Sequence, residues 1–461
     1  MRICAYVNDK YAKLNYKNEC FDSRIFAGLR LVIDILQRSG YTVDYAGMAT
    51  CHLYDIVLVS ITSDCDWWEY IAERLLWQNG GYKVIIGGAG VLNVRPFLEY
   101  ADYFVLGRAE NIINNLVANI DGYDHPSVID SRTFNIGNEY YINQVDKPYP
   151  HEIDLGKGKT YTESQIGCNH KCAFCSYSWQ RKFTGDKFKY GDLWSKNKNV
   201  ELAAFELLEA DSYDLNSLRT TAIDGLSQRL RYAVNKRISR EMIRELYIKL
   251  ATIEKPHQVK LYNIVGYPTE SEDDWNEFIE DVIIADKELH RQPKQLGILL
   301  HNTPFRAMPV TPLACAPMSK IEYRGMISKM YNSDKKYKGG IFYQGNAIWG
   351  VQSMGIESLP TVMLSAIIWR GSENDSDNIA KISTNAKFKR SCTAIKQATL
   401  EKYFDIDTLF WEYTPETLPT RYLHTYCKVE KTYATALKRF KSMEVNKCQT
   451  NNLNLKPCVT V

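Results

Sequence analysis

Three cysteines, Cys168, Cys172 and Cys175, stand close together in the segment YTESQIGCNHKCAFCSY. Their C-x3-C-x2-C spacing brings three thiolates into one short loop. Four thiolates normally saturate a 4Fe–4S cluster, so three leave one iron without a protein ligand. An open position distinguishes a catalytic metal from a structural one, because a substrate can bind there. The triplet therefore predicts an iron–sulfur cluster with one iron free to bind a small molecule.

Other interpretations of the triplet remain open. A zinc ribbon would need a second C-x2-C pair or suitably spaced histidines. A ferredoxin-type cluster would need a fourth nearby cysteine, and the next in sequence is Cys315. A redox C-x-x-C pair would leave Cys168 without a role. A non-catalytic iron–sulfur protein is a further alternative. Single cysteines are more often small buried hydrophobic residues; those outside the triplet are Cys4, Cys20, Cys51, Cys65, Cys315, Cys392, Cys427, Cys448 and Cys458.

The cysteine segment, with Phe174 before the third cysteine, resembles the signature of the radical SAM superfamily. The resemblance implies that the cysteines bind three irons of a 4Fe–4S cluster and that S-adenosylmethionine chelates the fourth. It implies reductive cleavage to methionine and a 5′-deoxyadenosyl radical, which abstracts hydrogen from a substrate not identified here. Phe174 would lie beside the cofactor. A one-electron reductant such as flavodoxin or ferredoxin would be a partner.

A second block, TAIDGLSQRLRYAVNKRISR at 221–240, resembles a stretch of radical SAM proteins that carry an N-terminal cobalamin-binding-type domain. The family pattern there is roughly E-G-x-S-x-R-L-R-x-x-x-N-K. The match implies cofactor binding by Asp224, Ser227, Arg229 and Arg231, with Asp224 in place of the usual Glu. A carboxylate at a strand end can hold amino or ribose groups. The structural alternative is an ordinary basic helix.

A third block, KLYNIVGYPTESEDDW at 260–275, is an apolar strand that ends in a turn and a helix start. It resembles the fifth-strand motif G-x-I-x-G of radical SAM barrels. The match implies that Ile264 and Gly266 pack along the adenine, because glycine lets a flat ring approach the backbone. Glu270 is either a cofactor contact or only a helix-start acid, and Glu209 is matched to the second-strand carboxylate. We expect Gly266 to lie near the cysteine loop.

The runs VIIGGAG at 84–90 and YFVLGRAE at 103–110 resemble the N-terminal domain of the same group. Glycines at a strand end fit a ligand site in an open α/β sheet, although a tight turn would also explain them. Cobalamin is therefore implied as a further cofactor, while residues 8–23 contain no histidine to bind cobalt. A cobalamin-dependent radical SAM methyltransferase is one alternative function. A tRNA methylthiotransferase-like enzyme is another, and it would need a second cluster from N-terminal cysteines.

The elements that position these motifs follow from apolar periodicity. Strands are expected at 2–7, 41–45, 55–61, 82–87 and 103–106, and helices at 23–38, 66–78 and 110–118. This alternation predicts an α/β fold that begins with a doubly wound parallel sheet. We expect a cobalamin-binding-like Rossmann-type domain at 1–125, a connector at 126–157, a radical SAM partial (βα)6 TIM-like barrel at 158–320, and a mixed α/β accessory or substrate region at 321–461. The cysteine loop should leave the first barrel strand, as active-site loops do in barrels.

The composition sets broad limits on function. The chain has 461 residues, is 45% hydrophobic and carries a formal net charge of +3. This length suffices for two or three domains, and the weak charge neither requires nor excludes a nucleic-acid substrate. A small molecule, a peptide and a nucleic acid all remain open as substrates. No signal peptide or long apolar run is evident, so a cytoplasmic protein without a membrane partner is expected.

Overall fold

The computed structural model of the chain describes residues 1–7, 27–77, 80–156, 159–163, 165–168, 170–185, 201–203, 220–251, 257–289, 296–319, 350–354, 359–385 and 395–442. The strands are β1 (Ile3–Tyr6), β2 (Val43–Ala46), β3 (Ile56–Ser60), β4 (Lys83–Gly87), β5 (Tyr103–Val105), β6 (Val128–Asp130), β7 (Tyr140–Tyr141), β8 (Ile153–Gly156), β9 (Lys159–Tyr161), β10 (Gln165–Ile166), β11 (Thr184–Gly185), β12 (Glu201–Ala203), β13 (Thr220–Ala222), β14 (His257–Val265), β15 (Leu296–Pro304), β16 (Gly350–Met354) and β17 (Leu423–His424). The α-helices are α2 (Ala27–Arg38), α3 (Asp64–Arg74), α4 (Ile113–Ala118), α5 (Ser176–Gln180), α8 (Gln228–Ala233), α9 (Arg240–Ala251), α10 (Glu272–Leu289), α12 (Leu359–Arg370), α13 (Ser376–Asn385), α14 (Gln397–Tyr403), α15 (Ile406–Phe410) and α16 (Tyr433–Ser442). Short 3-10 helices are η1 (Cys51–Leu53), η2 (Arg95–Tyr100), η4 (Glu373–Asp375) and η5 (Val429–Thr432).

The first sheet of the described residues has six strands in the order β2-β1-β3-β4-β5-β6. The first five are parallel, and β6 pairs antiparallel with β5. The strands and helices lie within a few residues of the predicted ranges, which confirms an α/β arrangement around a parallel sheet. β3 is central and buried from Ile56 to Val59, as expected for a strand covered on both faces. The edge strand β6 comes from the segment predicted as a connector.

Alternate residues of this sheet face two separate hydrophobic cores. Ile56 and Leu58 pack on the side of α2 and α4, whereas Val57 and Val59 pack on the side of α3. Successive side chains of a strand point to opposite faces, so each strand contributes to both cores. The sheet is therefore covered by helices on both sides, as the doubly wound prediction requires.

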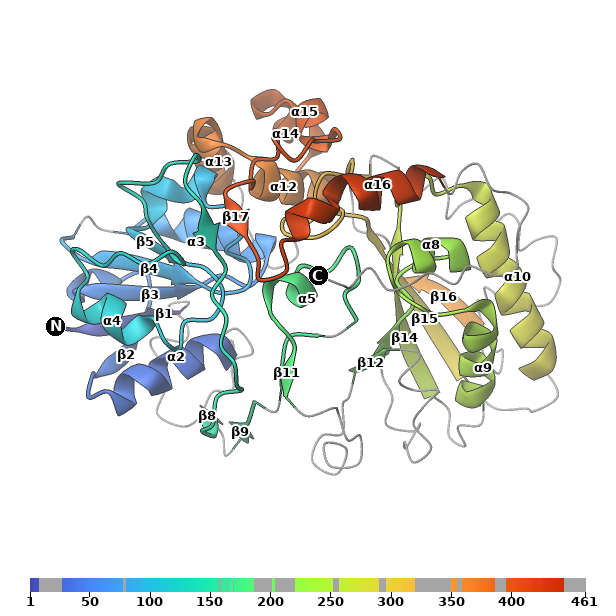
Figure 1. The fold of residues 1–461 in the computed structure, drawn as a ribbon, viewed down its shortest axis with the longest axis horizontal. Coiled ribbons are helices and arrows are strands. Elements are labelled where there is room, and N and C mark those ends of the chain that lie inside the picture. Colours follow the sequence, from blue (N-terminus) through green and yellow to red (C-terminus); the bar gives the residue numbers. More distant parts are fainter. Residues whose placement is uncertain are drawn as a thin grey trace.

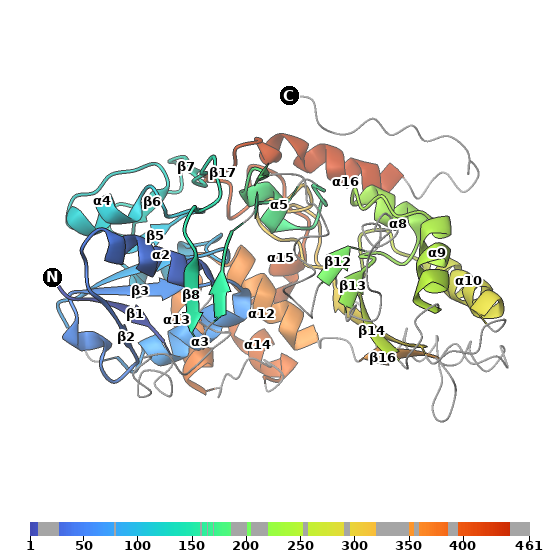
Figure 2. The same ribbon diagram turned by 90° about the horizontal axis from the view of Figure 1, so that it is seen from below.

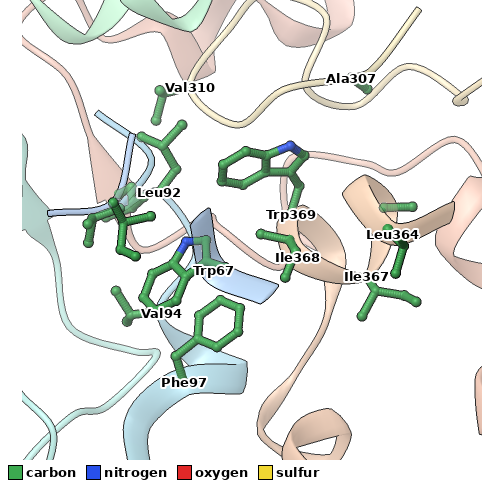
Figure 3. Packing of buried hydrophobic residues seen from close by; sticks show 14 of the residues in the cluster. Trp67, Leu92, Val94, Phe97, Ala307, Val310, Leu364, Ile367, Ile368 and Trp369 are labelled. Carbon is green, nitrogen blue, oxygen red and sulfur yellow. The ribbon is translucent and has the colours of Figure 1, made fainter. Parts of the chain in front are cut away.

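Helices from the C-terminal region complete the core on the α3 side. α12 and α13 pack against α3, and Figure 3 shows Trp67 between Phe97 and the α12 residues Ile368 and Trp369. The rings of Trp67 and Phe97 stack with centroids 3.8 Å apart. The buried Asn93 amide donates to the carbonyl of Ile368 at 3.0 Å. The C-terminal region thus covers one face of the N-terminal sheet.

The second sheet has the order β12-β13-β14-β15-β16, and all its described pairs are parallel. α9 and α10 pack against each other beside it (Figure 1, right). β16 comes from the predicted accessory region. In the described ranges the sheet is open, and closure into the predicted partial barrel is not shown. β10 pairs antiparallel with β11, so the described part of the chain does not show the cysteine loop leaving a strand of this sheet.

The cysteine loop and α5 lie between the two sheets, and α16 runs past α5 and α8 (Figures 1 and 2). The chain leading to α16 is held by β17, which pairs parallel with β7 through Leu423 and Tyr140. A segment from the far end of the chain is thereby brought next to the cysteine loop.

None of the helices in the described ranges has the length and apolar character needed to cross a lipid bilayer.

Candidate functional site

The cysteine loop follows β10, and α5 begins directly after Cys175. Two residues of the loop region have positive φ angles, Gly167 at 70° and Lys171 at 52°. The indole nitrogen of Trp179 donates to the carbonyl of Cys172 at 2.8 Å and fixes the turn. Left-handed backbone at a non-glycine residue is sparsely populated and collects at ligand clamps and active sites.

Val234 and Asn235 of the second motif bind the backbone of the cysteine loop. Ala173 N–H donates to the carbonyl of Val234 at 2.8 Å. The Asn235 side-chain amide donates to the carbonyls of His170 at 2.7 Å and Lys171 at 3.2 Å. The cysteine segment and the second motif, about 60 residues apart in sequence, are therefore in direct contact.

The third motif joins them through Tyr267, which is 2% exposed. Its ring lies 6.4 Å from that of Phe174, centroid to centroid. Its hydroxyl donates to the backbone carbonyl of Asp224 at 3.0 Å. The neighbouring Gly266 is thereby joined to the cysteine loop through the side chain of Tyr267, and its own closeness to the loop stays a prediction.

Charges gather around the buried Cys172. Burial raises the pKa of the Cys172 thiol to about 12; the positive charge of Lys236 opposes this rise, while Asp224, Cys175 and Cys168 add to it. Cys172 is thus near enough to Cys168 and Cys175 for their charges to act on it. Within the described ranges, however, no group of three or more His, Cys, Asp or Glu side chains is gathered tightly enough to hold a metal ion as it stands.

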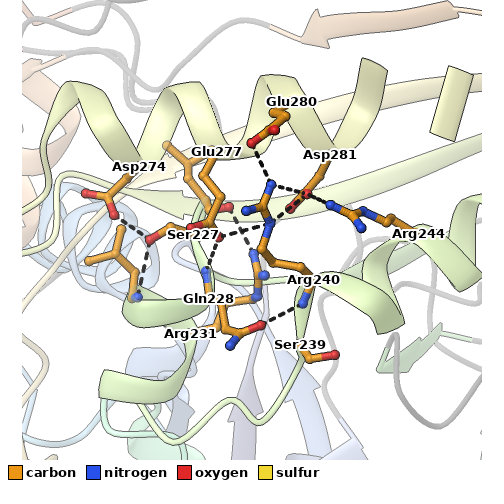
Figure 4. A network of polar contacts seen from close by, with 12 residues as sticks. Ser227, Gln228, Arg231, Ser239, Arg240, Arg244, Asp274, Glu277, Glu280 and Asp281 are labelled. Carbon is orange, nitrogen blue, oxygen red and sulfur yellow. Dashed lines mark hydrogen bonds and ion pairs between the residues drawn. The ribbon is translucent and has the colours of Figure 1, made fainter. Parts of the chain in front are cut away.

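Three residues predicted to bind the cofactor are engaged in contacts within the chain. Ser227 hydrogen-bonds Asp274, and Arg229 pairs with the same carboxylate and with the Thr269 carbonyl. Arg231 is 1% exposed, and its guanidinium donates to the carbonyls of Gly225, Leu226 and Ile238. Figure 4 shows how this network continues through Arg240 and Asp281. The contacts tie α8 to α9 and α10, and a cofactor role for these side chains stays a prediction.

The remaining predicted residues lie on the third motif or outside the described ranges. Ile264 is partly buried against the main core. Gly266 has φ of 79°, and its N–H donates to the Glu270 carboxylate at 2.7 Å. Tyr267 N–H and the Trp275 indole also donate to Glu270, so this carboxylate shapes the turn that follows β14. Glu209 falls outside the described residues.

Glu270→Gln is expected to change how stability depends on pH. Burial raises the pKa of Glu270 to about 7, although backbone N–H donors from Gly266 and Tyr267 favour its charged form. A carboxyl with a raised folded-state pKa stabilises the fold below its unfolded pKa and loses that contribution as pH rises through 7. Between about pH 4.5 and 7.5 the wild type should lose about 3 kcal/mol relative to the variant. Urea unfolding across this range measures the difference; parallel curves would contradict the assignment.

Sequence reasoning missed the contacts that the C-terminal segment makes with this site. The Lys171 ammonium lies 4.5 Å from the centre of the Tyr426 ring, and Phe440 of α16 stacks on Tyr267 at 5.9 Å. Lys236, although part of a matched pattern, was not assigned to the site. The partner residues stand far along the chain from the motifs, so spacing alone gave no signal for them.

A cavity of about 280 Å³ lies at the carboxyl edge of the first sheet. Its floor is formed by the ends of β3, β4 and β5 at Ser60, Gly87 and Val105, and its walls by α2 and α4. Open α/β sheets bind ligands at this edge. Of the predicted glycines, Gly87 has room, because an added Cβ would meet nothing closer than 3.8 Å. Gly88 has φ of 116°, and its Cβ would lie 2.2 Å from the Ile61 carbonyl, which explains that glycine by backbone approach.

The rim of the cavity carries charged side chains, and most of them form ion pairs with one another. Arg108 makes two hydrogen bonds of 2.6 Å to Glu163 and also pairs with Glu110. Arg181 also lines the cavity, stacked 4.6 Å over Tyr177. Burial lowers the pKa of Arg181, and its Nη1 has no hydrogen-bond partner among the described residues. An apolar hollow with a few polar groups at its rim is typical of small-molecule sites.

Comparisons with known proteins give distant structural likenesses only. No family model and no curated protein matches the chain. The radical S-adenosylmethionine methyltransferase TsrM from Kitasatospora setae, with cobalamin and a [4Fe-4S] cluster bound, is similar at 13% identity over 68% of this chain and 78% of that one, with a TM-score of 0.43. The apo cobalamin-dependent S-adenosylmethionine radical enzyme OxsB is similar at 10% identity over 98% of this chain and 62% of that one, with a TM-score of 0.26. At these TM-scores the likenesses define neither the fold nor the function of this chain.

Proposed function

We propose that the protein is a radical SAM enzyme that uses Cys168, Cys172 and Cys175 to hold a 4Fe–4S cluster. The observation that carries the proposal is the meeting of three motifs from distant parts of the chain. Ala173 binds Val234, and Phe174 contacts Tyr267. Each motif resembles a radical SAM block in sequence, and independent likenesses would have no reason to converge on one loop.

The donor set suits such a cluster chemically. Three thiols in one loop leave one iron open, and the buried Lys236 ammonium beside them offsets negative charge. When bound and reduced, the cluster would supply the electron that cleaves S-adenosylmethionine. Around it, Phe174 and Gly266 would provide flat and open surface for the nucleoside, and Asp224 would accept from its amino or ribose groups. Flavodoxin or ferredoxin would be the electron donor.

Anaerobic reconstitution tests this function directly. Purified full-length protein is loaded with iron and sulfide, then incubated with dithionite and S-adenosylmethionine. We expect a charge-transfer absorption band of a 4Fe–4S cluster and formation of 5′-deoxyadenosine. Protein that takes up a cluster but produces no 5′-deoxyadenosine would support a non-catalytic cluster instead, and protein that takes up none would overturn the proposal.

The sheet-edge cavity favours a second candidate, a cobalamin-dependent radical SAM methyltransferase. Ligand pockets typically start at roughly 300 Å³, so a cavity of about 280 Å³ fits part of cobalamin rather than the whole molecule. Its apolar walls and polar rim suit the flat nucleotide end, which Gly87, Tyr177 and Arg181 would contact. When bound, cobalamin would supply methyl-transfer chemistry.

Gly87→Leu is expected to weaken cobalamin binding at least about tenfold, because the new side chain grows into the hollow. Gly122→Leu is the matched control, since an added Cβ there meets nothing within 4 Å and Gly122 does not line the cavity. Equilibrium dialysis with hydroxocobalamin measures both. Wild-type protein that binds no cobalamin, or Gly87→Leu protein that binds as tightly as wild type, would contradict this assignment.

A further inference from the structure

The segment Val234–Lys236 is pressed against the cysteine loop by a specific set of contacts. Val234 accepts from Ala173 N–H, and the Asn235 amide donates to two carbonyls of the loop. Asn235 has φ of 61°, a left-handed conformation. The next side chain, Lys236, is buried instead of facing solvent.

Lys236 is buried, and its ammonium group forms an ion pair with Asp224. The residue is 7% exposed, and its Nζ lies 2.7 Å from the Asp224 carboxylate. Burial disfavours its ammonium form, but Asp224, Cys172 and Cys175 outweigh burial and raise its pKa. Lys236 is therefore positively charged at neutral pH. The contacts of Val234 and Asn235 with the cysteine loop place this ion pair next to the loop.

Asp224 is itself held in place from the third motif. Its φ of 51° is left-handed, and its carbonyl accepts the Tyr267 hydroxyl. Burying an ion pair costs desolvation energy that the pair alone often does not recover. Stability alone therefore gives little reason for a buried salt bridge next to the cysteine loop, which points to a role in the chemistry of the thiols.

We propose that Lys236 is a positioning residue whose fixed positive charge, oriented by Asp224, favours the reduced state of a cluster held by Cys168, Cys172 and Cys175. This inference rests on the proposed function. Reduction adds one electron from an external reductant to a site that is already negative. At an effective dielectric constant of about 20, a unit charge about 12 Å away changes that equilibrium by about tenfold.

Lys236→Met keeps an unbranched side chain of nearly the same length and removes the charge. At a fixed potential, the ratio of reduced to oxidised cluster should fall about tenfold, which is a shift of about 59 mV to lower potential for one electron. Asp224→Asn removes the opposing charge and should shift the potential the other way. Lys236→Arg retains the charge and should stay close to wild type. The exposed neighbour Arg237 gives the matched control, because Arg237→Met removes a surface charge that solvent screens.

The midpoint potential is measured on reconstituted full-length protein by titration with dithionite, following the electron paramagnetic resonance signal of the reduced cluster. Opposite shifts for Lys236→Met and Asp224→Asn support the inference, because a purely structural role would lower cluster content without separating the two signs. Unchanged potentials in both variants, with an intact wild-type cluster, would overturn this inference alone. Wild-type protein without a cluster would overturn the proposed function as well. If Lys236→Met fails to fold, the direction of the shift in Asp224→Asn still decides the sign.

Discussion

Cys172→Ala is expected to abolish formation of 5′-deoxyadenosine and to remove the charge-transfer absorption of the reconstituted protein. Cys172 is the most enclosed of the three cysteines, at 7% exposed, and its carbonyl anchors the turn through Trp179. Without its thiolate, two ligands remain for a cluster that already has an open iron. We expect product formation to fall more than about 100-fold. Iron and sulfide content, absorbance and product formation are measured together.

Cys65→Ala is the matched control for this experiment. Cys65 is a partly buried cysteine at the start of α3, and it is not one of the three predicted ligands. Its replacement should leave iron content and product formation at wild-type levels. If Cys65→Ala loses the cluster while Cys172→Ala retains it, the assignment of the ligands is wrong. Thermal unfolding of the cluster-free proteins separates loss of a ligand from loss of the fold.

Arg370→Met is expected to have the largest effect on stability. Arg370 ends α12 and is 3% exposed. Its guanidinium donates to the carbonyls of Ala314, Ala316, Leu409 and Trp411. Burial lowers the pKa of Arg370 to about 10. Its removal leaves several buried carbonyls without donors, so the free energy of unfolding should fall by about 3–5 kcal/mol.

The loss of these hydrogen bonds should also disturb the candidate site. Leu313, beside Ala314, donates its N–H to the carbonyl of Ala173 in the cysteine loop at 3.3 Å. Arg370→Lys should recover only part of the stability, since a compact ammonium does not span four carbonyls. Lys438→Met, at an exposed position of α16, should change stability by less than about 0.5 kcal/mol. Urea unfolding followed by tryptophan fluorescence measures all three. An Arg370→Met protein as stable as wild type would show that the four hydrogen bonds are replaced by water.

The first sheet was predictable because its signal is local. Strands such as Ile56–Ser60 are apolar runs bounded by polar residues, and α2 shows an apolar face at helical spacing. These patterns reflect burial of each element against its neighbours and need no knowledge of distant contacts. The antiparallel pairing of β6 was not predictable, because nothing in Val128–Asp130 specifies which edge it joins.

The candidate site was predictable in part. The cysteine spacing identified the thiols, since three ligands in one loop are adjacent whatever the fold. The cofactor role predicted for Arg231 was drawn from a pattern, yet the structure shows its guanidinium bound to three backbone carbonyls. The sequence shows that a residue is basic, but it does not show which way the side chain points. Burial and hydrogen-bond partners come only from packing.

The sequence alone determined the chemistry available to this protein. It supplies three thiols spaced for a cluster with one open iron, and a parallel sheet in which glycines follow one strand. The tertiary structure decided which groups meet that chemistry. It brought Lys236 and Asp224 beside Cys172, and it laid α12 over the N-terminal sheet from more than 250 residues away. Spacing constrains neighbours along the chain, whereas these contacts depend on how whole elements bury their apolar faces. For that reason the cysteines could be identified from the sequence, whereas the residues around them could not.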